Sequence, residues 1–155
     1  MDHAELMDFF VQHYKSTVAF DKHMGMTLKV EKPGYVSYEL EVKSHHLTAP
    51  NSAHGGVAAA MMDATLGVAA LSLAITKGNL CATVEFKINY LKQVAPGSVL
   101  VSNGRVKHAG NRIIVSAGNI IEQASGDLIA TGLGTFTQYQ AEKRDDIHPP
   151  PSDSP

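Results

Sequence analysis

The chain has 155 residues, 44% of them hydrophobic, and a formal net charge of −2. This length and apolar content suffice for one domain with a buried core and do not require a second domain. The 13 basic and 15 acidic residues form no long run of one sign, which argues against a surface for nucleic acids or for an anionic membrane. A single cysteine excludes an internal disulfide framework, and without a leader-like start the chain is expected to be cytoplasmic.

Residues 1–23 are predicted to form an N-terminal helix. Asp2 and Glu5 have the spacing of a capping box, and apolar residues recur every three or four positions behind them. This apolar face is expected to pack against the edge of a sheet or to close one end of a ligand pocket. Residues 26–31 and 34–42 are predicted to form a hairpin, which is split by a Lys-Pro-Gly turn.

The longest apolar segment runs from Val57 to Ile75 and contains a single acid, Asp63. Its length would suffice for a membrane span. The central acid, the many alanines and the strand-rich remainder of the chain favour a buried helix of a globular domain, and no membrane association is expected. Turn-forming residues and a glycine pair precede this helix, and Gly78 is expected to end it.

An ionised carboxylate in an apolar helix needs a partner or a function, because burying it alone costs several kcal/mol. The first turn of the same helix offers amides without internal acceptors, so those of His54 to Gly56 are a candidate oxyanion site. From Gly55 to Asp63 the distance along the axis is about 12 Å, at 1.5 Å per residue. The two groups therefore cannot easily act on one small reacting centre within a single chain.

The helix face that carries Asp63 is otherwise lined by small residues, namely Ala59, Ala60, Gly67, Ala70 and Ala74. Small side chains allow another backbone to approach closely. A second copy packed antiparallel across a twofold axis would bring the mouth of one helix to the Asp63 of the other. The sequence therefore predicts an obligate homodimer with shared active sites.

Four strands are predicted after the long helix. In the first, the residues expected to face the helix are Ala82, Val84, Phe86, Ile88 and Tyr90. The other three strands are predicted at residues 99–108, 112–122 and 128–139, and a tight turn joins strand 99–108 to strand 112–122. Two strands, a long helix and four strands indicate an α+β fold rather than a doubly wound nucleotide-binding sheet. Residues 141–155 are polar and proline-rich and are expected to form a disordered tail.

The His54-Gly55-Gly56 motif, the acid seven residues after the last glycine and the later segment CATVEFKINYLKQVAPGSVL resemble hotdog-fold acyl-CoA thioesterases. The closest likeness is to the phenylacetate-degradation and hydroxybenzoyl-CoA thioesterase type, over residues 25–139. The resemblance implies a single domain, residues 1–140, with a long central helix wrapped by a six-stranded antiparallel sheet. It implies homodimers that often pair into homotetramers, and hydrolysis of aryl- or fatty acyl-CoA to free acid and coenzyme A.

The resemblance also implies roles for individual residues. Asp63 would be the nucleophile or general base, and the Gly55 amide would polarise the thioester carbonyl. His54 and Asn51 would assist. Thr83 occupies the position where members of this family often carry a Ser or Thr near the acid.

One position departs from the pattern of some relatives, which carry the assisting Asn six residues before the motif histidine, where this chain has Thr48. Further contacts to the substrate are expected from Gly56, Ala59 and Gly67 on the helix. Three basic residues lie near a predicted hairpin: Lys107, His108 and Arg112. They either bind the phosphates of coenzyme A or belong to an ordinary solvated turn. No metal is expected because the histidines match no usual zinc spacing, and no cofactor is expected because coenzyme A is part of the substrate.

Other functions fit the sequence less well. A hotdog hydratase would typically carry a His five residues after the acid, where this chain has Val68. A serine or cysteine hydrolase is disfavoured because the chain has no G-x-S-x-G motif and Cys81 begins a strand without an evident base. The remaining alternative is a non-catalytic acyl-CoA-binding or scaffold protein, against which the presence of Asp63 and of both motif glycines weighs.

Overall fold

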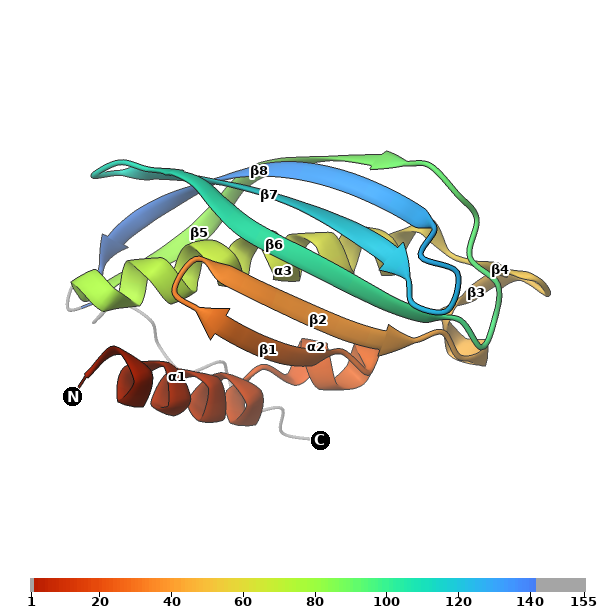
Figure 1. Cartoon of the computed structure of the whole chain (residues 1–155), viewed down its shortest axis with the longest axis horizontal. Coiled ribbons are helices and arrows are strands. Elements are labelled where there is room, and N and C mark those ends of the chain that lie inside the picture. The colour runs from red at the N-terminus through yellow and green to blue at the C-terminus, as the bar shows by residue number, and fades with distance from the viewer. Residues whose placement is uncertain (1, 142–155) are drawn as a thin grey trace, which may run out of the picture.

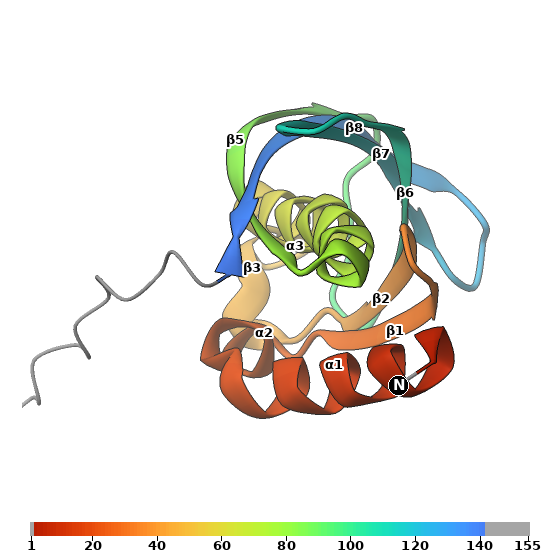
Figure 2. The same ribbon diagram turned by 90° about the vertical axis from the view of Figure 1, so that its left-hand side faces the viewer.

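A computed structural model describes residues 2–141 of the chain, so the tail expected at 141–155 lies outside the described residues apart from Ala141. One long helix is enclosed by a curved antiparallel sheet, and two shorter helices lie on the open side of that sheet (Figures 1 and 2). In chain order the elements are α1 (His3–Thr17), α2 (Ala19–Met24), β1 (Thr27–Lys32), β2 (Tyr35–Glu41), the 3-10 helix η1 (Ser44–His46), β3 (Leu47–Ala49), β4 (Ser52–Ala53), α3 (Gly55–Ala74), the 3-10 helix η2 (Ile75–Lys77), β5 (Asn79–Tyr90), β6 (Val99–Ala109), β7 (Ile113–Glu122) and β8 (Leu128–Gln140).

The main sheet has six strands in the order β1-β2-β6-β7-β8-β5, and all neighbouring strands are antiparallel. Strands β3 and β4 form a separate two-stranded hairpin, which the sequence did not predict. The sheet curls around α3 from β1 to β5 (Figure 2). The α+β class and the hotdog arrangement of six strands around a central helix are therefore confirmed.

Helix α3 is the centre of the core. Together with η2 it is the one helix among the described residues that is long and apolar enough to cross a membrane. The sheet encloses it instead, because Met61, Leu66 and Ala69 have no exposed surface. Burying a side chain such as Leu66 stabilises the fold by about 1.5–3 kcal/mol. The helical segment ends where expected, at Gly78, whose φ of 72° is in the left-handed region.

A row of glycines brings α3 close to the sheet. Gly104, Gly118 and Gly132 lie opposite one another on β6, β7 and β8. A Cβ atom on Gly104 would lie 2.8 Å from the backbone oxygen of Thr65, and one on Gly132 would lie 2.6 Å from the sulfur of Met62. A side chain at Gly104 would therefore collide with the backbone of α3, and one at Gly132 would have to displace the side chain of Met62.

The N-terminal segment differs from the single helix predicted over residues 1–23. The expected capping box at Asp2 and Glu5 is present, but the helix breaks at Val18, whose ψ is 92°. The hydroxyls of Ser16 and Thr17 both donate to the same backbone oxygen in the preceding turn, at 2.8 Å. Hydroxyl side chains of this kind offer the backbone an alternative to the helical hydrogen bonds, which favours an end at this point.

Strand β5 differs from the strict alternation predicted for it. Its pairing with β8 shifts by one residue between Thr83 and Glu85, so Val84 is an extra, bulged residue. Ala82 and Val84, both predicted to face α3, are exposed. Thr83, predicted to face away, instead donates a hydrogen bond to α3. The bulge thus places the side chains of Thr83 and Phe86 on the same face of β5.

Candidate active site

The start of α3 is shaped by the side chain of His54. The β3–β4 hairpin leads directly into the helix, with Asn51 exposed in its turn. His54 is the N-cap, and its Nδ1 accepts a hydrogen bond of 2.8 Å from the Gly56 amide. Asn51 has no hydrogen bond within residues 2–141, so the structure does not show it assisting either Gly55 or Asp63.

Most amides at the mouth of α3 already have acceptors. The His54 N–H donates to the His46 backbone oxygen at 2.8 Å, and the Gly56 N–H is taken by the His54 ring. The Val57 N–H donates to the His54 backbone oxygen at 2.9 Å. Among the described residues, the Gly55 N–H has no acceptor. Of the three amides of His54 to Gly56 that were expected to form the oxyanion site, only that of Gly55 is therefore free among the described residues.

The position of His54 depends on a second histidine. His46 is 3% exposed; its Nδ1 accepts from the Lys43 amide at 3.0 Å, and its Nε2 lies 3.0 Å from the Met24 backbone oxygen. Assigned from these partners, the ring is neutral with its proton on Nε2. Burial lowers the pKa of His46, with a further lowering from His45, which favours this neutral form. His46 thus ties the end of α2 to the chain that caps α3.

Asp63 lies two turns further along α3 and is half-buried. Its Oδ1 accepts a hydrogen bond of 3.0 Å from the Thr83 hydroxyl on β5, so the two residues lie together as expected. Within residues 2–141, its Oδ2 has no hydrogen-bond partner. A carboxylate held through one oxygen and free at the other can take a proton from water or attack a carbonyl carbon.

Two titratable groups near Asp63 stay protonated. The Cys81 sulfur lies 3.8 Å from the Gly67 backbone oxygen, and burial raises the pKa of this thiol to about 12. A cysteine held in this state is not a nucleophile at neutral pH. Burial, with the negative charges of Asp21 and Asp63, raises the pKa of Tyr14 on α1 to about 12. Neither Cys81 nor Tyr14 is therefore a ready nucleophile or base at neutral pH.

Two cavities flank the mouth of α3, and both are lined by His54 and Val57. One, of about 310 Å³, also contains Gly55 and Tyr90 in its wall. The other, of about 620 Å³, is bounded by α2, η1 and the Gly56 side of the helix. Their volumes are those of small-molecule sites, and a ligand in the first cavity would lie against Gly55, whose N–H is free.

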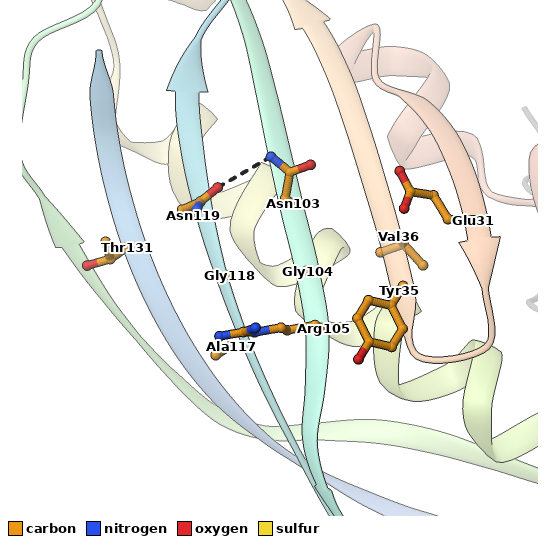
Figure 3. Close-up of a pocket in the computed structure, with 10 residues that line it drawn as sticks. All are labelled: Glu31, Tyr35, Val36, Asn103, Gly104, Arg105, Ala117, Gly118, Asn119 and Thr131. Carbon is orange, nitrogen blue, oxygen red and sulfur yellow. Dashed lines mark hydrogen bonds between the residues drawn. The ribbon is translucent and has the colours of Figure 1, made fainter. Parts of the chain in front are cut away.

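A third pocket, of about 480 Å³, lies on the outer surface of the sheet. Its lining includes Asn103, Arg105 and Asn119, and it faces away from α3 (Figure 3). It contains neither Asp63 nor any residue of the helix mouth. It is therefore separate from the candidate active site.

The other residues predicted to contact substrate lie in two different parts of the structure. Ala59 and Gly67 are half-buried on α3, close to Asp63 in the helix. The basic residues Lys107, His108 and Arg112 are exposed around the β6–β7 turn. That turn lies at the end of the molecule where α3 ends (Figure 1). Within one chain, the three basic residues are therefore remote from the Gly55 amide.

One residue of the site was not recognised from the sequence. The Tyr90 hydroxyl, at the end of β5, donates to the Gly55 backbone oxygen at 3.1 Å. The sequence predicted Tyr90 only as a helix-facing apolar position. The one hint in the sequence was that position 90 carries a Tyr, whose hydroxyl can form a hydrogen bond, where the pattern requires only an apolar side chain.

Comparison with protein families matches residues 51–128, from the β3–β4 turn to the start of β8, to the thioesterase superfamily. A relative from Archaeoglobus fulgidus is 30% identical over 122 residues, which cover 79% of this chain and 75% of the relative. The chain belongs to the thioesterase superfamily. This thioesterase is also 28% identical to human acyl-coenzyme A thioesterase 13 over 118 residues, 75% of its own length and 82% of that relative.

Solved structures share the fold. The E. coli PaaI protein from the phenylacetic acid degradation operon matches with a TM-score of 0.77 at 20% identity, over 84% of this thioesterase and 92% of PaaI. The smu.793 protein of Streptococcus mutans, bound to acetyl CoA, matches with a TM-score of 0.65 at 25% identity, over 74% and 89% of the two chains. The thioesterase is thus a thioester hydrolase with the hotdog architecture that its sequence predicted.

Proposed function

We propose that this thioesterase hydrolyses aryl- or fatty acyl-CoA thioesters to a free acid and coenzyme A. The observation that carries the proposal is the pair of groups left unsatisfied on α3, the Gly55 N–H and Oδ2 of Asp63. One is a hydrogen-bond donor and the other an acceptor, as thioester hydrolysis requires. A human relative is named for acyl-CoA hydrolysis, and a structural neighbour binds acetyl CoA, which supports a coenzyme A ester as the substrate.

The Gly55 N–H activates the electrophile in this scheme. It donates to the thioester carbonyl oxygen, which gains negative charge when the carbonyl carbon is attacked. It lies at the first residue of a 20-residue helix, whose dipole adds positive potential at this end. One well-placed donor of this kind stabilises the transition state by about 3 kcal/mol.

Asp63 supplies the second function. Its free oxygen either takes a proton from an attacking water or attacks the carbonyl carbon itself to form an anhydride that water then opens. In both routes the carbon–sulfur bond breaks, and coenzyme A leaves as a thiolate that takes up a proton. Thr83 holds the other carboxylate oxygen, so that Oδ2 keeps one orientation.

The separation of Gly55 and Asp63 along α3 supports sites shared between two copies of the chain in a homodimer. Strand β5 is at the edge of the sheet, is 12 residues long, and carries Val84 with 58% of its surface exposed. A long edge strand with unpaired backbone groups favours pairing with another strand. Two copies joined here with antiparallel helices would bring each Gly55 towards the Asp63 of the other copy.

The direct test is release of free thiol from a panel of aryl and fatty acyl-CoAs. We expect turnover by the wild type and loss of most of it in Asp63→Asn, which keeps the size of the side chain and its contact with Thr83. Tight binding of coenzyme A without thiol release from any ester would instead indicate a non-catalytic acyl-CoA-binding protein.

Gly55→Pro tests the amide separately, because proline removes the N–H and suits the first position of a helix. The preceding residue, His54, already has the backbone conformation preferred before proline, with φ −64° and ψ 138°. A Cβ atom at position 55 would meet Tyr90 at 3.5 Å, an ordinary contact. We expect kcat to fall about 100-fold in Gly55→Pro and much less in Gly55→Ala, which keeps the N–H. Equal activity of the two variants would contradict the assignment.

A further inference from the structure

Tyr90 packs directly on the first residue of α3. Its hydroxyl donates to the Gly55 backbone oxygen at 3.1 Å. Its ring atoms lie 3.5 and 3.6 Å from the point where a side chain on Gly55 would begin. Tyr90 therefore borders the space beside Gly55 at van der Waals distance, and it restrains the carbonyl of the same residue.

The start of α3 needs such a restraint, because it consists of two consecutive glycines. Glycine has the freest backbone of all residues, so a glycine pair at a helix end is prone to fraying. The amide of Gly56 is fixed by the His54 ring. The amide of Gly55 has no acceptor within residues 2–141 before substrate binds. Gly55 is instead held through its carbonyl oxygen, which accepts the hydrogen bond from Tyr90.

We propose that Tyr90 is a positioning residue, which holds Gly55 so that its free N–H points at the thioester carbonyl. The inference rests on the proposed function, in which this N–H binds the developing oxyanion. A hydrogen-bond donor contributes fully to catalysis only when it is already aligned and requires no reorganisation during the reaction. Tyr90 supplies this alignment without contacting the reacting atoms.

The same strand orients the second catalytic group. Thr83 holds Asp63 with its hydroxyl, and Tyr90 holds Gly55 with its hydroxyl, both from β5. Positions 83 and 90 are of opposite parity and would face opposite sides of a regular strand. The bulge at Val84 brings both side chains to the face of α3. Strand β5 is thus the element that aligns both groups on the helix.

Tyr90→Phe tests the proposal, because it removes one hydroxyl and keeps the ring. Tyr35→Phe is the matched control, since Tyr35 is 41% exposed on the outer face of the sheet and Tyr90 is 54% exposed. We expect kcat for an acyl-CoA to fall about 5- to 10-fold in Tyr90→Phe, with KM and melting temperature as in the control. A rise in KM with kcat unchanged would instead indicate that Tyr90 binds substrate from the wall of its cavity, and would overturn the proposal.

A double variant separates positioning from an independent effect. Once Gly55→Pro has removed the N–H, no donor is left to align, so adding Tyr90→Phe should lower kcat by less than twofold more. Multiplication of the two effects would contradict the proposal. If Gly55→Pro alone has no effect, the oxyanion assignment itself fails. If Gly55→Pro is impaired but Tyr90→Phe matches Tyr35→Phe, only the positioning role fails.

Discussion

The two oxygens of Asp63 have different surroundings, and this difference defines the site at the scale of single residues. Oδ1 is held by the Thr83 hydroxyl at 3.0 Å, whereas Oδ2 has no partner within residues 2–141. A carboxylate fixed at one oxygen cannot rotate its free oxygen away from a substrate without losing that hydrogen bond. In the proposed mechanism, Thr83 therefore holds one orientation of the acid.

Replacing Thr83 tests this role. Thr83→Val keeps the shape of the side chain and removes the hydroxyl, so we expect kcat to fall about tenfold, the cost of one hydrogen bond to a charged group. Thr83→Ser restores the hydroxyl and should recover most of the activity. Thr83 is exposed, so neither change should alter the melting temperature. Equal kcat values for the Val and Ser variants would show that the hydroxyl does not matter.

Sequence reasoning at this scale succeeded where it depended on the cost of burial. An acid in an apolar helix required a partner or a function, and Asp63 has a hydroxyl partner on a neighbouring strand. It failed where the answer depended on a rotamer. Nothing in the motif shows that the His54 ring turns back to accept from Gly56, which removes one amide from the candidate oxyanion site. The role of Tyr90 was missed because it depends on which backbone oxygen the hydroxyl reaches.

At the scale of elements, the position of α3 depends on the glycine row of β6, β7 and β8. We expect Gly104→Ala to destabilise the protein by about 1–3 kcal/mol, because the new Cβ would lie 2.8 Å from a backbone oxygen of the helix and the backbone must shift. Urea unfolding measures this change. Gly110→Ala is the control, since its closest neighbour is the tip of the exposed His108 side chain at 3.2 Å, which can turn away. A similar loss in both variants would contradict the packing argument.

The link between α2 and the mouth of α3 predicts a pH dependence. Burial lowers the pKa of His46, so the unfolded chain takes up a proton near pH 6.5 at this residue while the folded chain does not. The free energy of unfolding should therefore fall as the pH decreases through 6.5. His46→Gln keeps a donor for Met24 but does not titrate, so it should lose less stability between about pH 7.5 and 5.5. His23→Gln controls for loss of an exposed imidazole, and an unchanged slope in His46→Gln would contradict the prediction.

Element boundaries show where local patterns fail. The hydrophobic periodicity predicted six strands and the long helix, because each has one face on a common core. The periodicity did not predict the break at Val18 or the bulge at Val84. Each of these irregularities involves a single residue and depends on hydrogen bonds, which the spacing of apolar residues does not describe. The bulge matters most, because without it Thr83 would face away from Asp63.

At the scale of the whole molecule, one chain holds its two candidate catalytic groups about 12 Å apart on a rigid helix. Motion within the chain cannot bring them together, because both groups lie on the same continuous helix, whose rise per residue fixes their separation. The proposed homodimer removes this difficulty, since each site would take its amide from one copy and its acid from the other. The central claim is therefore that neither copy has a complete site alone.

Complementation between two inactive variants measures this claim most directly. Asp63→Asn and Gly55→Pro chains carrying different tags are unfolded together, refolded, and assayed for acyl-CoA hydrolysis beside each variant alone. With random pairing, roughly half of the dimers are mixed, and each mixed dimer has one site with both wild-type groups. We predict recovery of about a quarter of the wild-type activity, which should purify with dimers that carry both tags. Activity no higher than the average of the two variants alone would contradict shared sites.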